Sequence, residues 1–482
     1  MKQTLRDSAA LRWSALLLLA LAMFCAYIFM DILSPIKDLM QSQRGWDSDA
    51  FGTMQGSETF LNVFVFFLIF AGIILDKMGV RFTALLSGAV MLVGACIKWY
   101  AISDSFIGSS AQTWFTENLN HIPVFEQLGV SPFYEGMPAS AKLAALGFMI
   151  FGCGAEMGGI TVSRGIVKWF KGREMALAMG SEMALARLGV ATCMIFSPFF
   201  AKLGGEVSVS RSVAFGVVLL CIALIMLVVY FFMDKKLDEQ TGEAEEKDDP
   251  FKISDLGQIL TSSGFWLVSL LCVLYYSAIF PFQRYGANML QCNLDGISAE
   301  AASNIFRWFP IGAAVITPFL GNFLDRKGKG ATMLMGGALL LICCHLVFAF
   351  VLPATKSPVI AYSTIVLLGI SFALVPAALW PSVPKIIDEK ILGSAYCLIF
   401  WVQNIGLCFV PKLIGNLLAS TNADNPAVIA AKAAGAEFIP YDYTVPLLVF
   451  ASFGVLALLF AIYLKALDKK RGFGLEQPNI KQ

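Results

Sequence analysis

The sequence predicts an all-α integral membrane protein with twelve transmembrane helices in two six-helix bundles. Three observations support this fold class: an apolar composition, a series of long hydrophobic runs, and a motif that occurs once in each half. Of 482 residues, 57% are hydrophobic and 14% are charged, and the mean hydropathy is +0.72. Soluble domains contain about 25% charged residues. Most of this chain is therefore expected to lie in a hydrocarbon core.

The hydrophobic runs are long enough to cross a bilayer. Trp13 to Met30, Val213 to Met233 and Pro446 to Leu464 are examples, because about 20 helical residues span a core of about 30 Å. Spans are expected to start near residues 12, 56, 82, 140, 174, 211, 264, 301, 331, 357, 393 and 443. Lys and Arg are roughly twice as frequent in the loops on the side of the termini, which predicts that both termini are cytoplasmic.

One charged segment near the middle of the chain separates six spans from six. It begins with DKKLDEQTGEAEEKDDP at Asp234 and contains few apolar residues. The predicted domains are an N-terminal six-helix bundle over residues 1–234, a charged cytoplasmic linker over 235–260 and a C-terminal six-helix bundle over 261–482.

A motif of the form G-x-x-x-D-[KR]-x-G follows the second and the eighth spans. The two copies are GIILDKMGVR, from Gly72 to Arg81, and GNFLDRKGKG, from Gly321 to Gly330. Glycine allows two helices to approach closely, and an aspartate can cap a neighbouring helix N-terminus. Such contacts can break and re-form during a conformational change. The residues expected to form this gate are Asp76, Arg81, Arg164, Asp325 and Arg326.

The repeated motif resembles the loop motif of the major facilitator superfamily. The resemblance implies the major facilitator fold, in which two six-helix halves surround a central cavity and transport occurs by alternating access. A channel is disfavoured, because repeated gating loops imply alternating closure. An enzyme is also disfavoured, because no HExxH, GxSxG or DDxxD run occurs. Eleven scattered cysteines without a CxxC pair, and two histidines outside any cluster, predict no metal site and no cofactor.

Two charged residues fall near the middle of predicted spans, where a charge requires a partner or a cavity. Glu156 lies midway along the span that starts near residue 140, and Arg187 lies midway along the next one. A short turn joins the two spans, so they are antiparallel neighbours and the two charges lie at the same depth. The pair is either a structural ion bridge or a site for the amine and the carboxylate of a zwitterionic solute.

Three further ionisable residues lie within or near spans. Glu182 and Asp31 are candidates for proton coupling, although Asp31 lies near the outer end of the first span, where we expect a solvated carboxylate that caps the helix. His345, alone on an apolar helix, is expected to be a packing residue.

Aromatic and amide residues beside helix-disturbing prolines complete a predicted pocket. Interrupted helices are tolerated in a membrane where a cavity or a neighbouring helix satisfies the freed backbone groups. The residues predicted to line the pocket are Asn62, Tyr275, Tyr276, Phe282, Trp380, Gln403 and Asn404.

Several strings in both halves resemble the lysosomal dipeptide uniporter branch of the superfamily. They are WFKGRE, LARLG, YYSAIFPF, AASNIF, ALWPSVP and LGSAYCLIFWVQNIGL. The resemblance implies a dipeptide-sized solute whose termini contact Glu156 and Arg187, with Tyr276 and Trp380 lining a tolerant side-chain space. The N-terminus lacks the acidic dileucine signal of the lysosomal members, so we expect a bacterial inner membrane location.

The predicted function is transport of dipeptides or similar small zwitterionic solutes, as a uniporter or coupled to protons. The alternative is an organic-anion transporter in which Arg187 binds a carboxylate and Glu156 is only its counter-ion. The predicted partners are the small-molecule solute and the lipid bilayer. A net charge of +1 indicates no nucleic-acid partner, and we expect a monomer.

Overall fold

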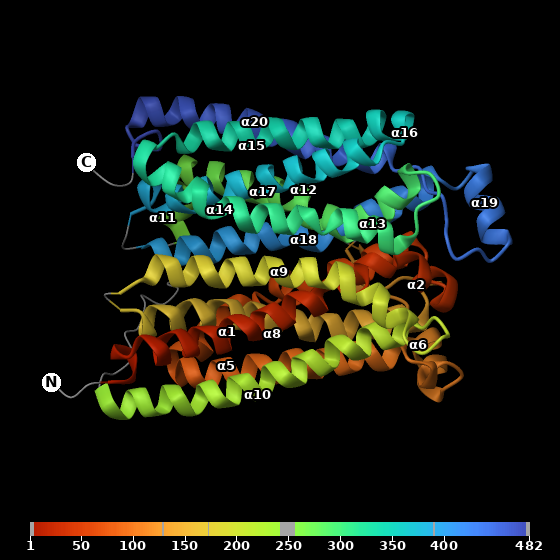
Figure 1. The fold of residues 1–482 in the computed structure, drawn as a ribbon, viewed down its shortest axis with the longest axis horizontal. Helices are drawn as coiled ribbons and strands as arrows, with labels where there is room; N and C mark the ends of the chain where they lie inside the picture. The colour runs from red at the N-terminus through yellow and green to blue at the C-terminus, as the bar shows by residue number, and fades with distance from the viewer. Residues whose placement is uncertain (1–3, 128–129, 172, 242–255, 389–390, 479–482) are drawn as a thin grey trace. The chain divides into compact units, whose positions relative to one another are not determined.

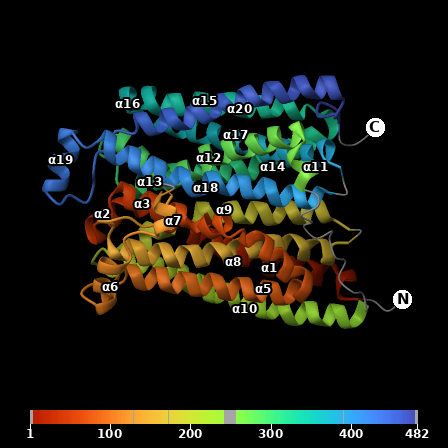
Figure 2. The same cartoon turned by 180° about the vertical axis from the view of Figure 1, so that it is seen from behind.

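The computed structural model describes residues 4–127, 130–171, 173–241, 256–388 and 391–478 (Figures 1 and 2). Every regular element within these residues is a helix, as the sequence predicts. The chain divides into two compact units. The first consists of Met1–Ile32 and Ser57–Pro250, and the second of Leu33–Gly56 and Phe251–Gln482.

The first unit contains five long helices. They are α1 (Ala9–Met30), α5 (Phe67–Ile102), α8 (Ala139–Trp169), α9 (Met175–Lys202) and α10 (Val209–Thr241). Helix α5 contains the last part of the second predicted span and the third span, which meet at Gly79, where the backbone adopts φ 79° and ψ 167°. Only glycine adopts this conformation readily. Helix α5 packs beside α8, and α1 packs beside α9 (Figure 1).

The second unit contains the other six predicted spans. Among the described residues, ten helices are long and apolar enough to cross a membrane. The number is below twelve because α5 contains parts of two predicted spans and because α14, the longer helix of the eighth span, is not among the ten. The elements of these spans are α12 (Ser263–Asn293), α13 (Ala299–Phe306), α14 (Trp308–Lys327), α15 (Gly330–Leu346), α17 (Pro358–Ile386), α18 (Leu392–Thr421) and α20 (Thr444–Arg471).

The segment between the first and second spans belongs to the second unit. It contains α2 (Lys37–Arg44) and α3 (Ser48–Gly56), and α3 packs directly on α18. A methyl group added at Gly56 would lie 2.1 Å from the carbonyl oxygen of Cys408, so the two backbones touch. The sequence-based division places this segment within residues 1–234. Residues 242–255 of the predicted linker lie outside the described residues.

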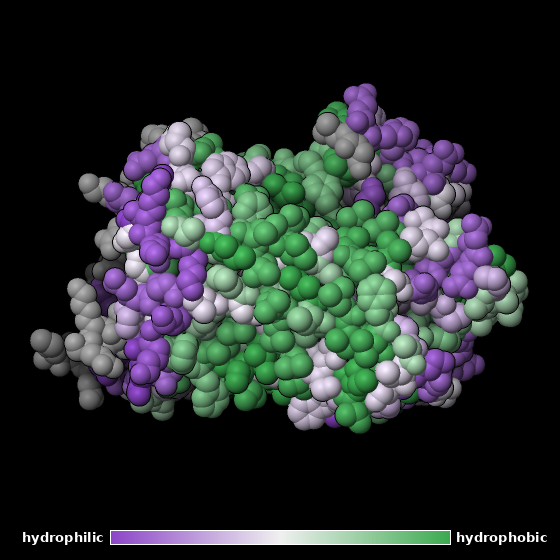
Figure 3. Space-filling view, turned by 90° about the horizontal axis from the view of Figure 1, so that it is seen from above, coloured by the Kyte–Doolittle hydropathy of each residue, from purple (hydrophilic) through white to green (hydrophobic). Residues whose placement is uncertain are grey.

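The outer surface of the helices is apolar in the middle and polar at the ends. Figure 3 shows one face on which hydrophobic side chains form a continuous area between two hydrophilic ends. On α20, for example, Val455, Leu459 and Ile462 are exposed. Large apolar patches are rare on soluble monomers, so this surface is expected to face lipid.

Small residues allow α5 and α8 to pack at close range. A methyl group at Gly94 would lie 2.3 Å from the backbone nitrogen of Phe151, and one at Gly147 would lie 2.7 Å from the carbonyl oxygen of Gly94. Contacts of this kind stabilise helix pairs in membranes, where the hydrophobic effect does not drive association.

Gly94→Ala is expected to destabilise the first unit, because the added methyl group overlaps the backbone of α8. Overpacking of this kind costs about 1–3 kcal/mol, which should lower the midpoint of thermal unfolding in detergent. Gly336→Ala is the matched control, since nothing lies within 4 Å of the added methyl group there. Equal midpoints for the two variants would contradict this account of the α5–α8 contact.

Candidate functional site

Charged residues from α8 and α9 cluster around one tyrosine of α1 in the first unit. Tyr27 lies within electrostatic range of Glu156 on α8 and of Glu182 and Arg187 on α9. Glu58, just before the second span, belongs to the same set. Glu58 is buried and the other members are half-buried. The structure therefore brings together the acid and the base that the sequence places at one depth.

Close backbone contacts position this cluster. The Cβ position of Gly189 lies 3.2 Å from the Cβ atom of Tyr27, so α9 approaches α1 near Arg187. The Cβ position of Gly152 lies 3.2 Å from the Cγ atom of Glu58. Gly152 and Glu156 are four residues apart and hence share one face of α8. This face carries Glu58 next to Glu156.

Tyr27 and Glu58 were not predicted from the sequence. Tyr27 lies in the run FCAYIFM, where an aromatic side chain is usually a packing residue, and Glu58 lies at the expected boundary of the second span. The available signal was an acid between Gly56 and Phe60, inside an otherwise apolar and small-residue stretch.

The expectation of a solvated Asp31 is wrong. The residue is the C-cap of α1 and is only 1% exposed. Asp31 and the fully buried Lys98 of α5 both interact electrostatically with Cys193 of α9. The Lys98 ammonium also lies 3.5 Å from the ring centroid of Phe148. The buried carboxylate of Asp31 therefore lies in the same region as the Lys98 ammonium and the Cys193 thiol. Lys98 was missed because it lies close to the predicted end of the third span.

Asn62 is a buried amide in the first unit, on the short helix α4 (Phe60–Phe64). Its side chain is 2% exposed, and neither polar atom has a hydrogen-bond partner among the described residues. Leaving a buried polar group unsatisfied costs about 1–3 kcal/mol. A solute or a water molecule that completes these bonds would remove that cost, which is consistent with the predicted place of Asn62 in a pocket.

Two predicted residues of the second unit, Tyr276 of α12 and Trp380 of α17, lie together. The indole Nε1 of Trp380 donates a hydrogen bond to the Tyr276 hydroxyl at 3.2 Å. The Trp380 ring stacks on Phe400 of α18, with centroids 5.0 Å apart, and the Tyr276 ring stacks on Phe280 at 5.3 Å. We call these four residues the aromatic cluster. It joins three helices of this unit.

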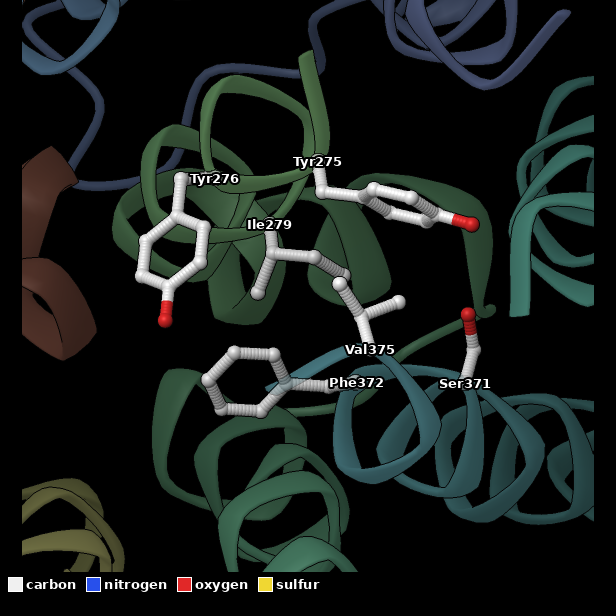
Figure 4. Close-up of a pocket in the computed structure, with 6 residues that line it drawn as sticks. All are labelled: Tyr275, Tyr276, Ile279, Ser371, Phe372 and Val375. Atoms are coloured by element: carbon white, nitrogen blue, oxygen red, sulfur yellow. The ribbon is translucent and has the colours of Figure 1, made fainter. Parts of the chain in front are cut away.

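A narrow crevice between α12 and α17 adjoins the aromatic cluster (Figure 4). It is too narrow to admit a water molecule. The hydroxyl of Tyr275 points away from Tyr276 and donates to the carbonyl oxygen of Leu334. The crevice is therefore a packing feature and offers no polar binding site. It is lined by Tyr275, Tyr276, Ile279, Ser371, Phe372 and Val375.

The other predicted pocket residues of this unit are buried. Phe282 is 1% exposed and packs against Phe306, Phe450 and His345, so the structure does not bring it to the aromatic cluster. His345 is fully buried and its Nδ1 lies 2.9 Å from the carbonyl oxygen of Leu341, in agreement with the predicted packing role.

Two amide residues on α18 complete the predicted set. Gln403 and Asn404 follow Phe400 by three and four residues, so they lie on the same face of α18 as that member of the aromatic cluster. They are 8% and 1% exposed. The Gln403 Oε1 atom accepts a hydrogen bond from the Cys272 thiol at 3.4 Å.

Ion pairs connect the first copy of the repeated motif to neighbouring helices. Arg164 Nη2 lies 3.0 Å from Asp76 Oδ1, and both residues belong to the predicted gate. Arg81 Nη1 lies 2.7 Å from the Oδ2 atom of Asp238 on α10, and Lys168 Nζ lies 2.6 Å from the Oδ1 atom of the same residue. The copy is thus tied to both α8 and α10.

The second copy has a different arrangement. Arg326 is exposed, whereas Asp325 is half-buried and interacts electrostatically with Lys385 at the end of α17. In the first unit, Arg12 Nη2, near the start of α1, lies 3.0 Å from Glu174 Oε2, at the start of α9. Hydrogen bonds from its own backbone N–H and from Arg12 lower the pKa of Glu174.

The chain is similar in sequence to proteins that are named as dipeptide transporters. The chain is 29% identical to the lysosomal dipeptide transporter MFSD1 of Bos taurus over 284 residues, which is 57% of this chain and 59% of that protein. The human protein of the same name is 29% identical over 286 residues, 58% of this chain and 60% of its own length. The chain thus spans about three fifths of the length of these curated relatives.

Solved structures share the fold at low sequence identity. The nucleoside transporter NupG superposes with a TM-score of 0.68 at 12% identity and covers 93% of this chain and 99% of its own. A bacterial homologue of the human lysosomal transporter Spinster, inward-facing and unoccupied, gives 0.67 at 16% identity and covers 96% and 98%. The family model described as Major Facilitator Superfamily matches residues 19–411. The chain belongs to this superfamily, whose members named here are transporters.

Proposed function

We propose that this protein transports dipeptides or similar small zwitterionic solutes by alternating access. The observation that carries the proposal is the cluster of Glu156 and Arg187 around Tyr27 in the first unit. An acid and a base on adjoining helices match the amine and the carboxylate of a zwitterion. The names of the relatives, dipeptide transporters at 29% identity, support the same solute class.

The two termini of the solute bind to different helices in this proposal. The amine contacts Glu156 on α8, and the carboxylate contacts Arg187 on α9 as a charge-assisted hydrogen bond. Both protein groups have partners in the solute-free protein. A solute with one charge of each sign can replace such bonds without leaving an uncompensated charge in the membrane.

The aromatic cluster provides the space for side chains. Tyr276 and Trp380 offer flat surfaces with one hydroxyl and one N–H group, and these surfaces accept apolar and polar side chains alike. Broad side-chain specificity follows. The amides Asn62, Gln403 and Asn404 supply further donors and acceptors to the peptide group.

Alternating access requires contacts that break and re-form. The Asp76–Arg164 and Arg81–Asp238 ion pairs, together with Asp325 and Arg326 of the second copy, are proposed to fulfil this role.

We propose that both termini lie in the cytoplasm and that the protein is a monomer in a bacterial inner membrane. Glu182 and Asp31 are proposed as proton-coupling residues. Uniport remains the alternative.

An organic-anion transporter is the second candidate. In this case Arg187 supplies the charge that binds a carboxylate and Glu156 is only its counter-ion. Glu58 and Glu182 in the same cluster disfavour this candidate, because they repel an anion. The two candidates differ in whether the solute must carry an amine.

Arg187→Ala is expected to abolish dipeptide transport while the protein stays folded. Removing one partner of a buried charge pair costs about 2–5 kcal/mol, roughly a 30-fold loss or more. Counterflow of Ala-Ala in proteoliposomes measures the effect, with gel filtration and thermal unfolding as checks of the fold. Arg211→Ala is the control, because Arg211 lies outside the cluster and donates a hydrogen bond to the carbonyl oxygen of Glu206 in the loop before α10. Full activity of the Arg187 variant would remove this residue from the site.

Glu156→Gln separates the two candidate solute classes. If Glu156 binds the solute amine, the variant should need at least about tenfold more Ala-Ala for half-maximal inhibition of counterflow. The concentration of N-acetyl-Ala-Ala needed for inhibition, which is already high because this peptide lacks the amine, should not change. An anion transporter would instead be inhibited by succinate in preference to Ala-Ala. Equal effects of the substitution on both peptides would exclude an amine contact at Glu156.

Glu182→Gln tests proton coupling. A glutamine cannot accept a proton at neutral pH, so stimulation of Ala-Ala uptake by an inward proton gradient is expected to disappear. Counterflow without a gradient should persist. Glu437→Gln, on an exposed loop, is the control. Unchanged stimulation in the Glu182 variant would assign coupling elsewhere, and no stimulation in the unmodified protein would indicate uniport.

A further inference from the structure

The chain folds back on the second unit after α20 ends. Gly472 terminates the helix with φ 73°. The side chain of Leu475 is 1% exposed, and its backbone N–H donates to the Oδ1 atom of Asp468 at 3.1 Å. We call residues 472–478 the tail. It is therefore packed against the unit rather than free in solvent.

The tail caps the first turn of α15. The backbone N–H groups of Lys329 and Gly330 donate to the carbonyl oxygens of Glu476 at 3.1 Å and Leu475 at 2.9 Å. The Glu476 carboxylate accepts from the Thr332 N–H and from its hydroxyl, each at 2.8 Å. The N-cap residue of α15, Lys329, makes no side-chain cap of its own. The tail thus satisfies groups that a helix N-terminus leaves open, and it places a negative charge at the positive end of the helix dipole.

The last two glycines of the second motif copy make room for the tail. A methyl group at Gly328, whose φ is 70°, would lie 2.5 Å from the carbonyl oxygen of Glu476. One at Gly330 would lie 2.8 Å from the carbonyl oxygen of Leu475. Any larger residue at either position would collide with the tail backbone. The tail is therefore a reason for glycine at these two positions, in addition to the positive φ of Gly328.

The tail also holds the end of α17. Lys385 Nζ donates to the carbonyl oxygens of Gly474 at 3.1 Å and of Gln477 at 3.4 Å. Three elements consequently meet at the tail: the α14–α15 connection, the end of α17 and the end of α20.

In the first unit, the corresponding helix ends are connected directly, without a tail. The sixth span ends in MDKK at Asp234, and the twelfth ends in LDKK at Asp468. Asp234 accepts directly from Lys168 Nζ, at 2.7 Å, at the end of the fourth span. In the second unit, Asp468 accepts from the tail, and Lys385, at the end of the tenth span, donates to the tail. The tail thus provides bonds that the lysine and the aspartate form with each other in the first unit.

We propose that the tail is a releasable strap. In the bound state it caps α15 and holds Lys385. In the released state Lys385 binds Asp468 directly, as Lys168 binds Asp234, and the glycine-containing loop of residues 328–330 is free to move. Release is feasible because each hydrogen bond contributes little net free energy, and ordering the tail costs backbone entropy of a similar size.

A reversible crosslink tests whether release is part of the transport cycle. In a Thr332→Cys, Glu476→Cys double variant, a bis-methanethiosulfonate reagent with a two-carbon spacer should join the tail to α15, because the spacer replaces the length of the Glu476 side chain, which reaches the Thr332 hydroxyl at 2.8 Å in the native protein. Counterflow of Ala-Ala is expected to fall at least about tenfold on crosslinking and to recover with dithiothreitol. The two single-cysteine variants, treated identically, control for the native cysteines. Equal rates before and after crosslinking would overturn the proposal, since a purely structural strap need not move.

Hydrogen exchange tests release without any solute, so its outcome does not depend on the dipeptide assignment. In the unmodified protein, the amides of residues 329, 330 and 332 should exchange at least about tenfold faster than the amide of Leu341 in the interior of α15. Glu476→Gln should accelerate them further, whereas Glu437→Gln should not. Exchange as slow as that of Leu341 would show that the strap stays bound and would overturn the proposal, even if the dipeptide is transported.

Discussion

The cost of placing ionised groups in hydrocarbon constrains the whole structure. A charge at the centre of a bilayer requires a partner or a water-filled cavity, and the first unit meets this requirement twice. One group surrounds Tyr27 and contains Glu58, Glu156, Glu182 and Arg187. The other brings Asp31 and Lys98 into the range of Cys193 near the opposite helix ends. Helices α1, α5, α8 and α9 must approach closely for either group to exist, which is why glycines occur at their contacts.

Depth in the membrane could be predicted from the sequence because it follows from counting residues along a helix. Glu156 and Arg187 were placed at one level in this way, and the structure brings both to Tyr27. Which side of a helix points to the interior of the unit is harder to predict when apolar residues occur on all sides. Phe282 therefore appeared equivalent to Tyr276, yet it packs against His345 in the interior of the second unit. Glu58 and Lys98 lie near span boundaries, where the count itself is least reliable.

Segments outside the spans could not be predicted, since their positions depend on contacts between residues far apart in the chain. The packing of α3 on α18 rests on backbone contacts at Gly52, Gly56 and Gly415, and no local pattern indicates the partner of a glycine. The tail is a similar case. Glu476 occurs in an ordinary polar terminus, and only the structure reveals that it caps α15.

The junction at Gly79 has a mechanical consequence. The second and third spans are joined through one non-helical residue, so no loop separates them. When one of these spans moves, either the φ and ψ angles of Gly79 change or the other span moves with it. The ion pair of Asp76 with Arg164 lies three residues from this pivot. Loss of this ion pair would therefore remove a restraint on the angle between the two parts of α5 that meet at Gly79.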